Sequence, residues 1–502
     1  MSTNKRSKVL IIGIDSMDRL LLEQYLEDLP TFREVKEKTP PLNMKSVFPP
    51  DSDTAWASIY TGLYPTKHGV VTFVDPLEKS LKIQTEESDA NKIRGKTFWD
   101  YLTKKRHFSV ILLPHIAYPP WEINGIFVSR SRVKDDVKSQ SPDLPIRFDL
   151  SRLNPPKGVP KKDTKTLRSL VKKYKELVKN ETNFFEKMIK NTDWNLFFAY
   201  SSALDAIQHY FWSYCDPTDP AYPGKNEFET VIREFYMLYD NLVRRLLNHI
   251  DENTIVLILS DHGHTKRPEF VVNLNKILKD LGLLSTSQNV TSTTLDRIKE
   301  ITAYLVSKYN LGWIASKVLR FFPSVKDVYS KPSSIDWENT IAYTTDMSGI
   351  KSYTYGGIII NKNLLKNVEE YEKIREYIIN NLSFILHPET GENLVEWVIK
   401  RESLYGDGEY LHLYPDILVQ LKEGFGIGHK ATGPLITKAH TSNIVPGSHR
   451  GDTPILFVYS PDKKINVSKK DVELVDIAPT ILDLFGIDWR NYNMDGKSIL
   501  LR

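Results

Sequence analysis

The pattern of hydrophobic residues predicts short buried strands separated by amphipathic helices. Five apolar runs rich in β-branched or aromatic residues are typical of strands buried on both faces of a parallel sheet. These runs are 9–14, 108–113, 196–200, 254–260 and 454–458. The first ends in Asp15 and the fourth is followed by Asp261, so acidic side chains stand where two of the predicted strands end.

Helical periodicity fills the intervals between these runs. Residues 164–189 and 226–249 each place their apolar side chains on one helix face, and residues 20–26 carry the same spacing. Strands that alternate with helices predict an α/β fold: a doubly wound, mostly parallel central sheet with helices on both faces. Ligands of such sheets bind beyond the carboxyl ends of the strands.

Two stretches look like additions to this core. Residues 130–163 are rich in Lys, Asp, Ser and Pro and are expected to form loops. Residues 266–337 carry helix patterns without a strong strand, so we predict a helical insertion or cap there. The expected organisation is therefore 1–265 as the first part of the α/β core, 266–337 as the insertion, and 338–502 as the remainder of the core. Within that remainder, 341–420 could form a smaller α+β lobe or extend the main sheet.

Composition narrows the class of protein. The 502 residues include 41% hydrophobic and 26% charged residues, which is ordinary for a globular protein. The formal net charge of +4 is too small to indicate a stable nucleic-acid partner or an anionic membrane surface. No apolar segment reaches the roughly 18–20 residues of a membrane span. The single cysteine, Cys215, excludes internal disulfides and a cysteine-rich metal site, so a cytoplasmic protein is expected. A homo-oligomer is left open.

A hydroxyl stands at the start of a predicted helix in segment 52–69. Pro49 and Pro50 stop any preceding element, and Ser52 follows where the helix should begin. Its hydroxyl could cap the first turn, and a helix N-terminus also favours phosphate oxygens. A simple capping serine is the plainer interpretation of this residue taken alone.

Two pairs of ionisable residues have the spacing of metal ligands. Asp205 and His209 lie four residues apart, so a helix would place both on one face, although such a pair taken alone is more often an exposed hydrogen bond than a metal site. Asp261 and His262 end a very apolar strand, where an ionisable pair is costly unless it is paired. That cost favours a ligand role for the second pair.

The full candidate set holds three Asp, three His and one hydroxyl. Alone, Asp15 could cap the next helix and His449 could lie in a surface loop. Together, mixed carboxylates and imidazoles suit Zn²⁺ or Mn²⁺, and seven ligands suit two ions roughly 4 Å apart that share a phosphoryl oxygen. The seven residues are Asp15, Ser52, Asp205, His209, Asp261, His262 and His449.

The ordered motifs of the chain resemble the alkaline phosphatase superfamily, and within it the type I phosphodiesterase/nucleotide pyrophosphatase branch with its predicted prokaryotic phosphohydrolases. The resemblance spans nearly the whole chain except roughly 130–165 and 266–337. The motifs that carry it are 9–15, 49–69, 118–129, Asp205 with His209, 260–263, 447–450 and 476–486. The resemblance implies an alkaline-phosphatase-like fold.

Residue by residue, the resemblance implies a bimetallic phosphohydrolase. It assigns Asp205, His209 and His449 to one ion, and Asp15, Asp261, His262 and the nucleophile to the other. The branch usually has a Thr nine residues before the Thr of its Thr-Gly pair, and here that position is Ser52; Thr54 is the alternative if the loop is shifted. Two divalent ions are expected, Zn²⁺ as first choice and Mn²⁺ as the alternative.

Two departures from related patterns bear on the substrate. The nucleotide pyrophosphatases carry a phosphate-binding Asn where this chain has Phe73, which argues against strict nucleotide pyrophosphatase specificity. The sulfatase pattern requires Pro and Arg where Thr54 and Trp56 stand, so a sulfatase is not expected.

The expected function is hydrolysis of phosphate esters, phosphodiesters first, through a phosphoseryl intermediate on Ser52. The expected partner is a small phosphate-ester substrate, which could be a nucleotide. A phosphomonoesterase, a phosphomutase of the same superfamily and a non-catalytic binding module are the alternatives. Further candidates for touching the substrate, each equally natural in a structural or surface role, are Lys67, Arg130, His264, Lys266, His440 and Arg450.

Overall fold

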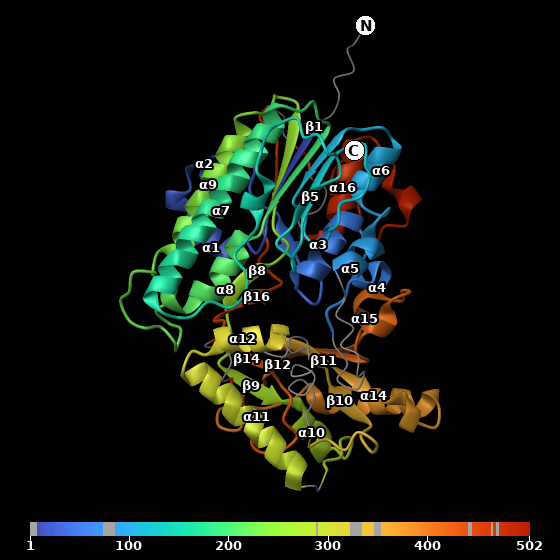
Figure 1. The fold of residues 1–502 in the computed structure, drawn as a ribbon. Helices are drawn as coiled ribbons and strands as arrows, with labels where there is room; N and C mark the ends of the chain where they lie inside the picture. The colour runs from blue at the N-terminus through green and yellow to red at the C-terminus, as the bar shows by residue number, and fades with distance from the viewer. Residues whose placement is uncertain are drawn as a thin grey trace.

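The structure is a computed structural model of the chain. It describes residues 8–73, 86–287, 290–321, 334–345, 353–439, 444–462, 465–467 and 471–501. Figure 1 shows a large part built around a central sheet and, below it, a smaller lobe with its own strands and helices.

The large part is organised around a mixed, mostly parallel seven-stranded sheet. The five inner strands run parallel, and both edge strands, β17 and β5, pair antiparallel with their neighbours. In spatial order the strands are β17 (Leu456–Tyr459), β7 (Thr254–Leu259), β1 (Lys8–Ile14), β6 (Leu196–Ser201), β3 (Ser109–Leu112), β4 (Gly125–Arg130) and β5 (Val137–Ser139). The predicted fold class is confirmed.

Each face of this sheet has its own hydrophobic core, because successive side chains of a strand point to opposite faces. Leu10 and Ile12 of β1 pack with the helices on one side, whereas Val9 and Ile11 pack with those on the other. The first side holds α1 (Arg19–Gln24), α2 (Pro30–Lys38), α7 (Thr164–Lys190), α8 (Ala203–Cys215) and α9 (Val231–Leu247). The second holds α3 (Ser52–Thr61), α5 (Glu86–Ile93), α6 (Phe98–Lys104) and α16 (Ile477–Leu484).

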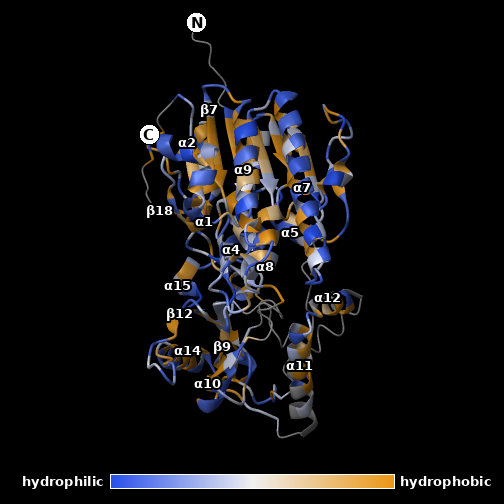
Figure 2. Ribbon diagram, turned by 90° about the vertical axis from the view of Figure 1, so that its left-hand side faces the viewer, coloured by the Kyte–Doolittle hydropathy of each residue, from blue (hydrophilic) through white to orange (hydrophobic). Residues whose placement is uncertain are grey.

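The two long helices of the first side are amphipathic, as their sequence periodicity predicts. In Figure 2 the faces of α7 and α9 that turn outward are mainly hydrophilic, and the strands behind them are hydrophobic. Short elements also lie on the second side: α4 (Pro65–His68) packs beside α3, and the parallel pair β2 (Asn43–Lys45) and β18 (Asp471–Glu473) adds Met44 and Val472 to its core. Among the described residues, no helix is both long and apolar enough to span a membrane.

The smaller lobe has a third, separate hydrophobic core. Its antiparallel sheet contains β10 (Ala342–Thr344), β11 (Tyr355–Ile360), β13 (Ile417–Leu421) and β12 (Val395–Lys400), accompanied by α14 (Val368–Leu382) and α15 (Glu402–Tyr405). The described residues of 341–420 therefore form an α+β lobe and do not extend the main sheet.

Residues 266–337 contain the predicted helices and also an unpredicted strand. The helices are α10 (Leu274–Asp280), α11 (Val290–Lys308) and α12 (Gly312–Phe321). The strand β9 (Phe270–Asn273) pairs with β14 (Phe425–Gly428) and β15 (Ile436–Lys438) in a separate three-stranded sheet, and Val272 of β9 packs in the hydrophobic core of the lobe. The division of the chain at residues 265 and 337 stays a prediction.

Candidate metal centre

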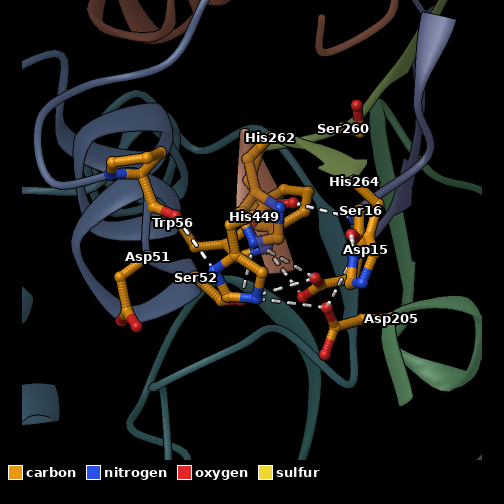
Figure 3. A network of polar contacts seen from close by, with 12 residues as sticks. Asp15, Ser16, Asp51, Ser52, Trp56, Asp205, Ser260, His262, His264 and His449 are labelled. Carbon is orange, nitrogen blue, oxygen red and sulfur yellow. Dashed lines mark hydrogen bonds and ion pairs between the residues drawn. The ribbon is translucent and has the colours of Figure 1, made fainter. Parts of the chain in front are cut away.

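All seven side chains singled out in the sequence lie near one another beyond the carboxyl ends of β1, β6 and β7, and Figure 3 shows five of them converging. They come from different elements that the sheet topology brings to one edge. Asp15 follows β1, Ser52 begins α3, Asp205 and His209 lie on α8, Asp261 and His262 separate β7 from β8 (Gly263–Lys266), and His449 lies on β16 (Gly447–Arg450). Strands β8 and β16 pair antiparallel and set His449 beside this corner.

The Ser52 hydroxyl points into this cluster. Its Oγ lies 3.1 Å from His262 Nε2 and 3.4 Å from Asp15 Oδ1. The helix cap is Asp51, whose side chain accepts from the Asp53 N–H at 3.2 Å. The expectation that Ser52 itself caps the helix is therefore wrong by one residue, and its hydroxyl is left to face the site.

Thr54, the alternative nucleophile, is directed elsewhere. It is fully buried on α3, and its Oγ1 makes no hydrogen bond to any described residue. It does not line the cavity into which Ser52 opens. The geometry therefore favours Ser52 over Thr54.

The three candidate imidazoles share one orientation. In each, Nδ1 faces a backbone carbonyl oxygen, so Nδ1 carries the proton and Nε2 is left with its lone pair. The pairs, each 3.0 Å apart, are His209 with Gly447, His262 with Gly263, and His449 with Pro50. A second hydrogen bond of this kind is what fixes the ring of a metal-bound histidine.

The lone pairs of two of these rings meet at one carboxylate. The Nε2 atoms of His209 and His449 are 2.9 Å apart, and each lies 3.4 Å from Asp205 Oδ1. That oxygen is buried and accepts no hydrogen bond from the described residues. Facing lone pairs beside an unsatisfied carboxylate oxygen repel one another unless a cation lies between them, so this donor set fits a metal ion.

A second group of donors adjoins the first. The ligand atoms of Asp15, Asp261 and His262 all lie within 4.8 Å of one another, as do those of Asp205, His262 and His449. Asp261 Oδ2 is buried without a hydrogen bond from the described residues and lies 3.1 Å from His262 Nε2. His262 thus belongs to both groups and stands between two candidate metal sites. Which ion each residue holds, including His209, stays a prediction.

The electrostatics of the cluster also favour cations. Burial, reinforced by Asp261 and Asp205, raises the pKa of Asp15 well above its ordinary value, and burial together with Asp205 raises the pKa of Asp261 likewise. Burial acts in the same direction on Asp205, but the imidazoles of His209 and His449 hold its pKa well below the usual range. Asp15 and Asp261 are therefore costly to ionise beside the charge of Asp205 unless positive charge is bound among them.

Replacing one carboxylate should stabilise the metal-free protein at alkaline pH. A raised pKa in the folded state means that stability is lost as the pH rises past the ordinary carboxyl range. Asp261→Asn keeps an acceptor for the Ser16 N–H, 3.1 Å from Oδ1, and removes the charge. In chelator at pH 8 we expect a melting temperature about 2 °C above that of the wild type, with a smaller difference at pH 5.

The matched control is Asp251→Asn at an exposed aspartate, which should change the melting temperature little at either pH. A metal-free Asp261→Asn protein that melts below the wild type at pH 8 would contradict the electrostatic argument.

Two aromatic side chains that the sequence did not indicate, Trp56 and Tyr200, support Asp15. Trp56 Nε1 donates to Asp15 Oδ2 at 3.2 Å, and the Tyr200 hydroxyl donates to the same oxygen. A Cβ atom at Gly13 would lie 2.7 Å from the Trp56 ring, so the glycine lets the indole approach the strand. Ser16, at φ 63°, turns its backbone N–H towards Asp261.

A further histidine, His115, links helix α3 to the side chains that support Asp15. His115 Nε2 lies 2.6 Å from Asp53 Oδ1, and its Nδ1 lies 3.0 Å from the Tyr200 hydroxyl. The residue after Ser52 is thereby tied, through two side chains, to Asp15. The position of His115 in the sequence could have indicated a place near the site, because it follows the strand run 108–113 at the same sheet edge.

The further candidates for touching the substrate lie in different environments. Lys67 pairs with Asp495, and Arg450 lies 2.9 Å from Asp452, so neither is directed at the cluster by its ion pair. His264 Nδ1 lies 2.8 Å from Ser16 Oγ, and its ring stacks on Trp212. Lys266 ends β8, and His440 lies outside the described residues.

A cavity of about 640 Å³ opens from this cluster. Asp15, Ser52 and Asp205 line its inner end. Its other walls include Arg130, whose guanidinium lies 2.6 Å from the buried carboxylate of Glu181. The Ser52 hydroxyl and two candidate carboxylates, Asp15 and Asp205, therefore open onto one space large enough for a small organic molecule.

Comparison with known proteins gives a family match and structural relatives. The protein-family model for type I phosphodiesterase / nucleotide pyrophosphatase matches residues 9–449, a range that includes all seven candidate residues. No curated protein matches the sequence.

Two solved structures illustrate the structural likeness. Human ectonucleotide pyrophosphatase/phosphodiesterase 5 is 14% identical, with a TM-score of 0.48 over 96% of this chain and 95% of that one. Phosphonoacetate hydrolase from Sinorhizobium meliloti 1021, in complex with phosphonoformate, is 12% identical, with a TM-score of 0.53 over 96% of each chain. At this identity the second likeness shows the fold alone.

Proposed function

The chain belongs to the type I phosphodiesterase/nucleotide pyrophosphatase family of phosphate-ester hydrolases, and from this premise we propose that it cleaves phosphodiesters through a phosphoseryl intermediate on Ser52. The observation that carries the proposal is the place of the Ser52 hydroxyl. It lies within 3.4 Å of both His262 and Asp15, at the inner end of a cavity. A hydroxyl so placed can meet a substrate phosphorus and the candidate metal donors together.

In the proposed reaction, Ser52 Oγ attacks phosphorus as the bond to the departing ester oxygen breaks in line. The departing alcohol takes up a proton, and the enzyme carries the remaining phosphoryl ester on Ser52. Water then attacks phosphorus, the Ser52 oxygen leaves and regains its proton, and a phosphate monoester is released. Before the attack, His262 presents Nε2 towards the Ser52 hydroxyl, because the Gly263 carbonyl holds its Nδ1.

The proposed cofactors are two divalent ions held by the seven residues named above. Their donor atoms are carboxylate and hydroxyl oxygens and imidazole nitrogens without a thiolate, which suits Zn²⁺ first and Mn²⁺ as the alternative. Ions bound there would supply Lewis-acid stabilisation of negative charge on the attacking, leaving and non-bridging oxygens.

The preference for diesters is supported by the arginines near the nucleophile. Arg130 is engaged by Glu181 at 2.6 Å, and Arg132 by Asp53 and by Asp89 at 3.1 Å. Both guanidinium charges are therefore already balanced. The second negative charge of a monoester phosphoryl group would find little further positive charge among these two side chains.

The environment of Phe73 supports a substrate other than those of strict nucleotide pyrophosphatases. Its ring packs against Phe48 and Tyr414, with ring centroids 6.0 and 5.3 Å apart. An aromatic side chain held in this cluster offers no amide for a phosphate oxygen. We also propose that the protein works in the cytoplasm, in keeping with its single cysteine.

A paired assay tests the proposal. Metal-loaded protein is expected to hydrolyse bis(4-nitrophenyl) phosphate with a kcat/KM about tenfold or more above that for 4-nitrophenyl phosphate, because no described arginine near Ser52 is left to balance the dianion. Rapid-quench labelling should also show phosphate bound to serine. Faster turnover of the monoester would make the protein a phosphomonoesterase, and transfer to a sugar-phosphate acceptor would make it a mutase.

A further inference from the structure

The cavity beyond Ser52 is larger than a phosphoryl group requires. Its volume of about 640 Å³ is within the range of pockets that hold whole small molecules, about 300–1,000 Å³. Only its inner end is formed by the candidate metal centre. The outer part is built by loop residues 155–159 and by helix α12 of the smaller lobe, which faces the large part in Figure 1.

Helix α12 presents two neighbouring side chains to this outer part. Trp313 and Lys317 are four residues apart, so they lie on one face of the helix, and both line the cavity. The helix begins close against its surroundings: a Cβ atom at Gly312 would lie 2.6 Å from the Ile444 side chain and 3.6 Å from that of Val159. Close packing at its first residue holds this face of α12 over the cavity.

Two lysines carry charge that the described residues do not fully balance. Lys157 Nζ is buried and makes no hydrogen bond to a described residue, and its nearest acid, Asp135 at 3.1 Å, is 77% exposed. Lys317 is exposed, lies 5.2 Å from the centre of the Trp313 ring, and forms no ion pair with a described residue. The ion pair of Lys157 contributes little to stability because Asp135 is solvated. The ammonium groups of Lys157 and Lys317 can therefore both bind an anionic group of a ligand.

Between these lysines and Ser52 the cavity wall is largely apolar. Leu113, Ile116 and Val159 line it together with Trp313. The space therefore runs from a site for a phosphoryl group, along an apolar and aromatic wall, to two lysines. A ligand that fills it has a hydrophobic body between two negative groups.

We propose that this outer part is a subsite for one ester group of the substrate, and that it selects a group with a hydrophobic or aromatic body and a negative charge at its far end. Lys157 and Lys317 hold the charge, and Trp313 packs against the body. The inference rests on the proposed function, because it assumes that Ser52 attacks the phosphorus of the same substrate.

Two symmetric diesters test the subsite, since either ester group can then occupy it. Bis(4-nitrophenyl) phosphate and bis(3-carboxy-4-nitrophenyl) phosphate differ by the carboxylate alone. We expect metal-loaded wild type to show a KM about tenfold lower for the carboxylated ester. Lys157→Ala and Lys317→Ala should each remove most of this preference, because each should raise the KM of the carboxylated ester several-fold more than the KM of the uncharged ester.

Lys308→Ala is the matched control. Lys308 lies on the neighbouring helix over the rings of Tyr304 and Tyr309 and does not line the cavity, so the preference should persist in that variant. Equal KM values for the two esters in the wild type, or equal losses on both esters in the lysine variants, would overturn the proposal.

A binding measurement separates this inference from the proposed function. If wild type cleaves neither ester, the proposed function fails, and calorimetry with 5-hydroxy-2-nitrobenzoate still tests the subsite. Binding by the wild type that is lost in the Lys157→Ala/Lys317→Ala double variant supports the subsite. Equal binding by both proteins, or none by either, overturns it.

Discussion

Replacing Ser52 by alanine is expected to lower kcat by about 10⁴-fold or more on any phosphodiester that the protein turns over. The reason is that the substitution removes the atom that the proposed reaction joins to phosphorus. The substitution removes the hydroxyl alone, and among the described residues that hydroxyl lies within hydrogen-bond distance of Asp15 and His262. The measurement is the rate of nitrophenolate release, together with the loss of serine-bound phosphate in a rapid quench.

Thr54→Val is the matched control because it removes a hydroxyl two residues away on the same helix. Thr54 Oγ1 is buried and makes no hydrogen bond to a described residue, so an isosteric apolar side chain should leave activity and melting temperature nearly unchanged. If Thr54→Val were the inactive variant and Ser52→Ala the active one, the nucleophile would be misassigned.

Removing the bound ions is expected to abolish turnover, with a loss of about 10³-fold or more that added Zn²⁺ or Mn²⁺ reverses. Metal analysis of the wild type should give about two ions per chain. His262→Ala should lose the most metal, because Nε2 of His262 belongs to both groups of donors. Asp205→Asn, which alters one group, should keep about one ion.

His249→Ala serves as the control for the loss of an imidazole, since that ring pairs with Glu186 at 2.9 Å, outside both donor groups. It should retain the metal content and activity of the wild type. Full activity of the chelated wild type, or two retained ions in His262→Ala, would argue against the bimetallic proposal.

The sequence predicted the sheet well because buried parallel strands leave an unambiguous pattern. The run 9–14 is apolar throughout since both of its faces are covered, and it becomes β1. The same logic located Asp15 and Asp261: a charged residue directly after such a run is conspicuous, and parallel strands bring their ends together. Pattern and topology together were enough to assemble the candidate residues.

What the sequence did not predict depends on tertiary contacts. Strand β9 is short and pairs with segments more than 150 residues away, so no local pattern marks it. Trp56 and Tyr200 resemble ordinary core aromatics until their polar atoms are seen at Asp15. The cap was misplaced by one residue because Asp51 and Ser52 are both favoured capping residues.

The Ser52 hydroxyl and helix α12 do not share a hydrophobic core. Ser52 begins a helix packed on the central sheet, whereas no described side chain of α12 belongs to the cores of that sheet or of the smaller lobe. Substitutions at Trp313 and Lys317 can therefore change the outer part of the cavity without repacking the layers that hold Ser52. Substrate range would then be tunable by an engineer, or by natural variation, while the chemical step is left intact.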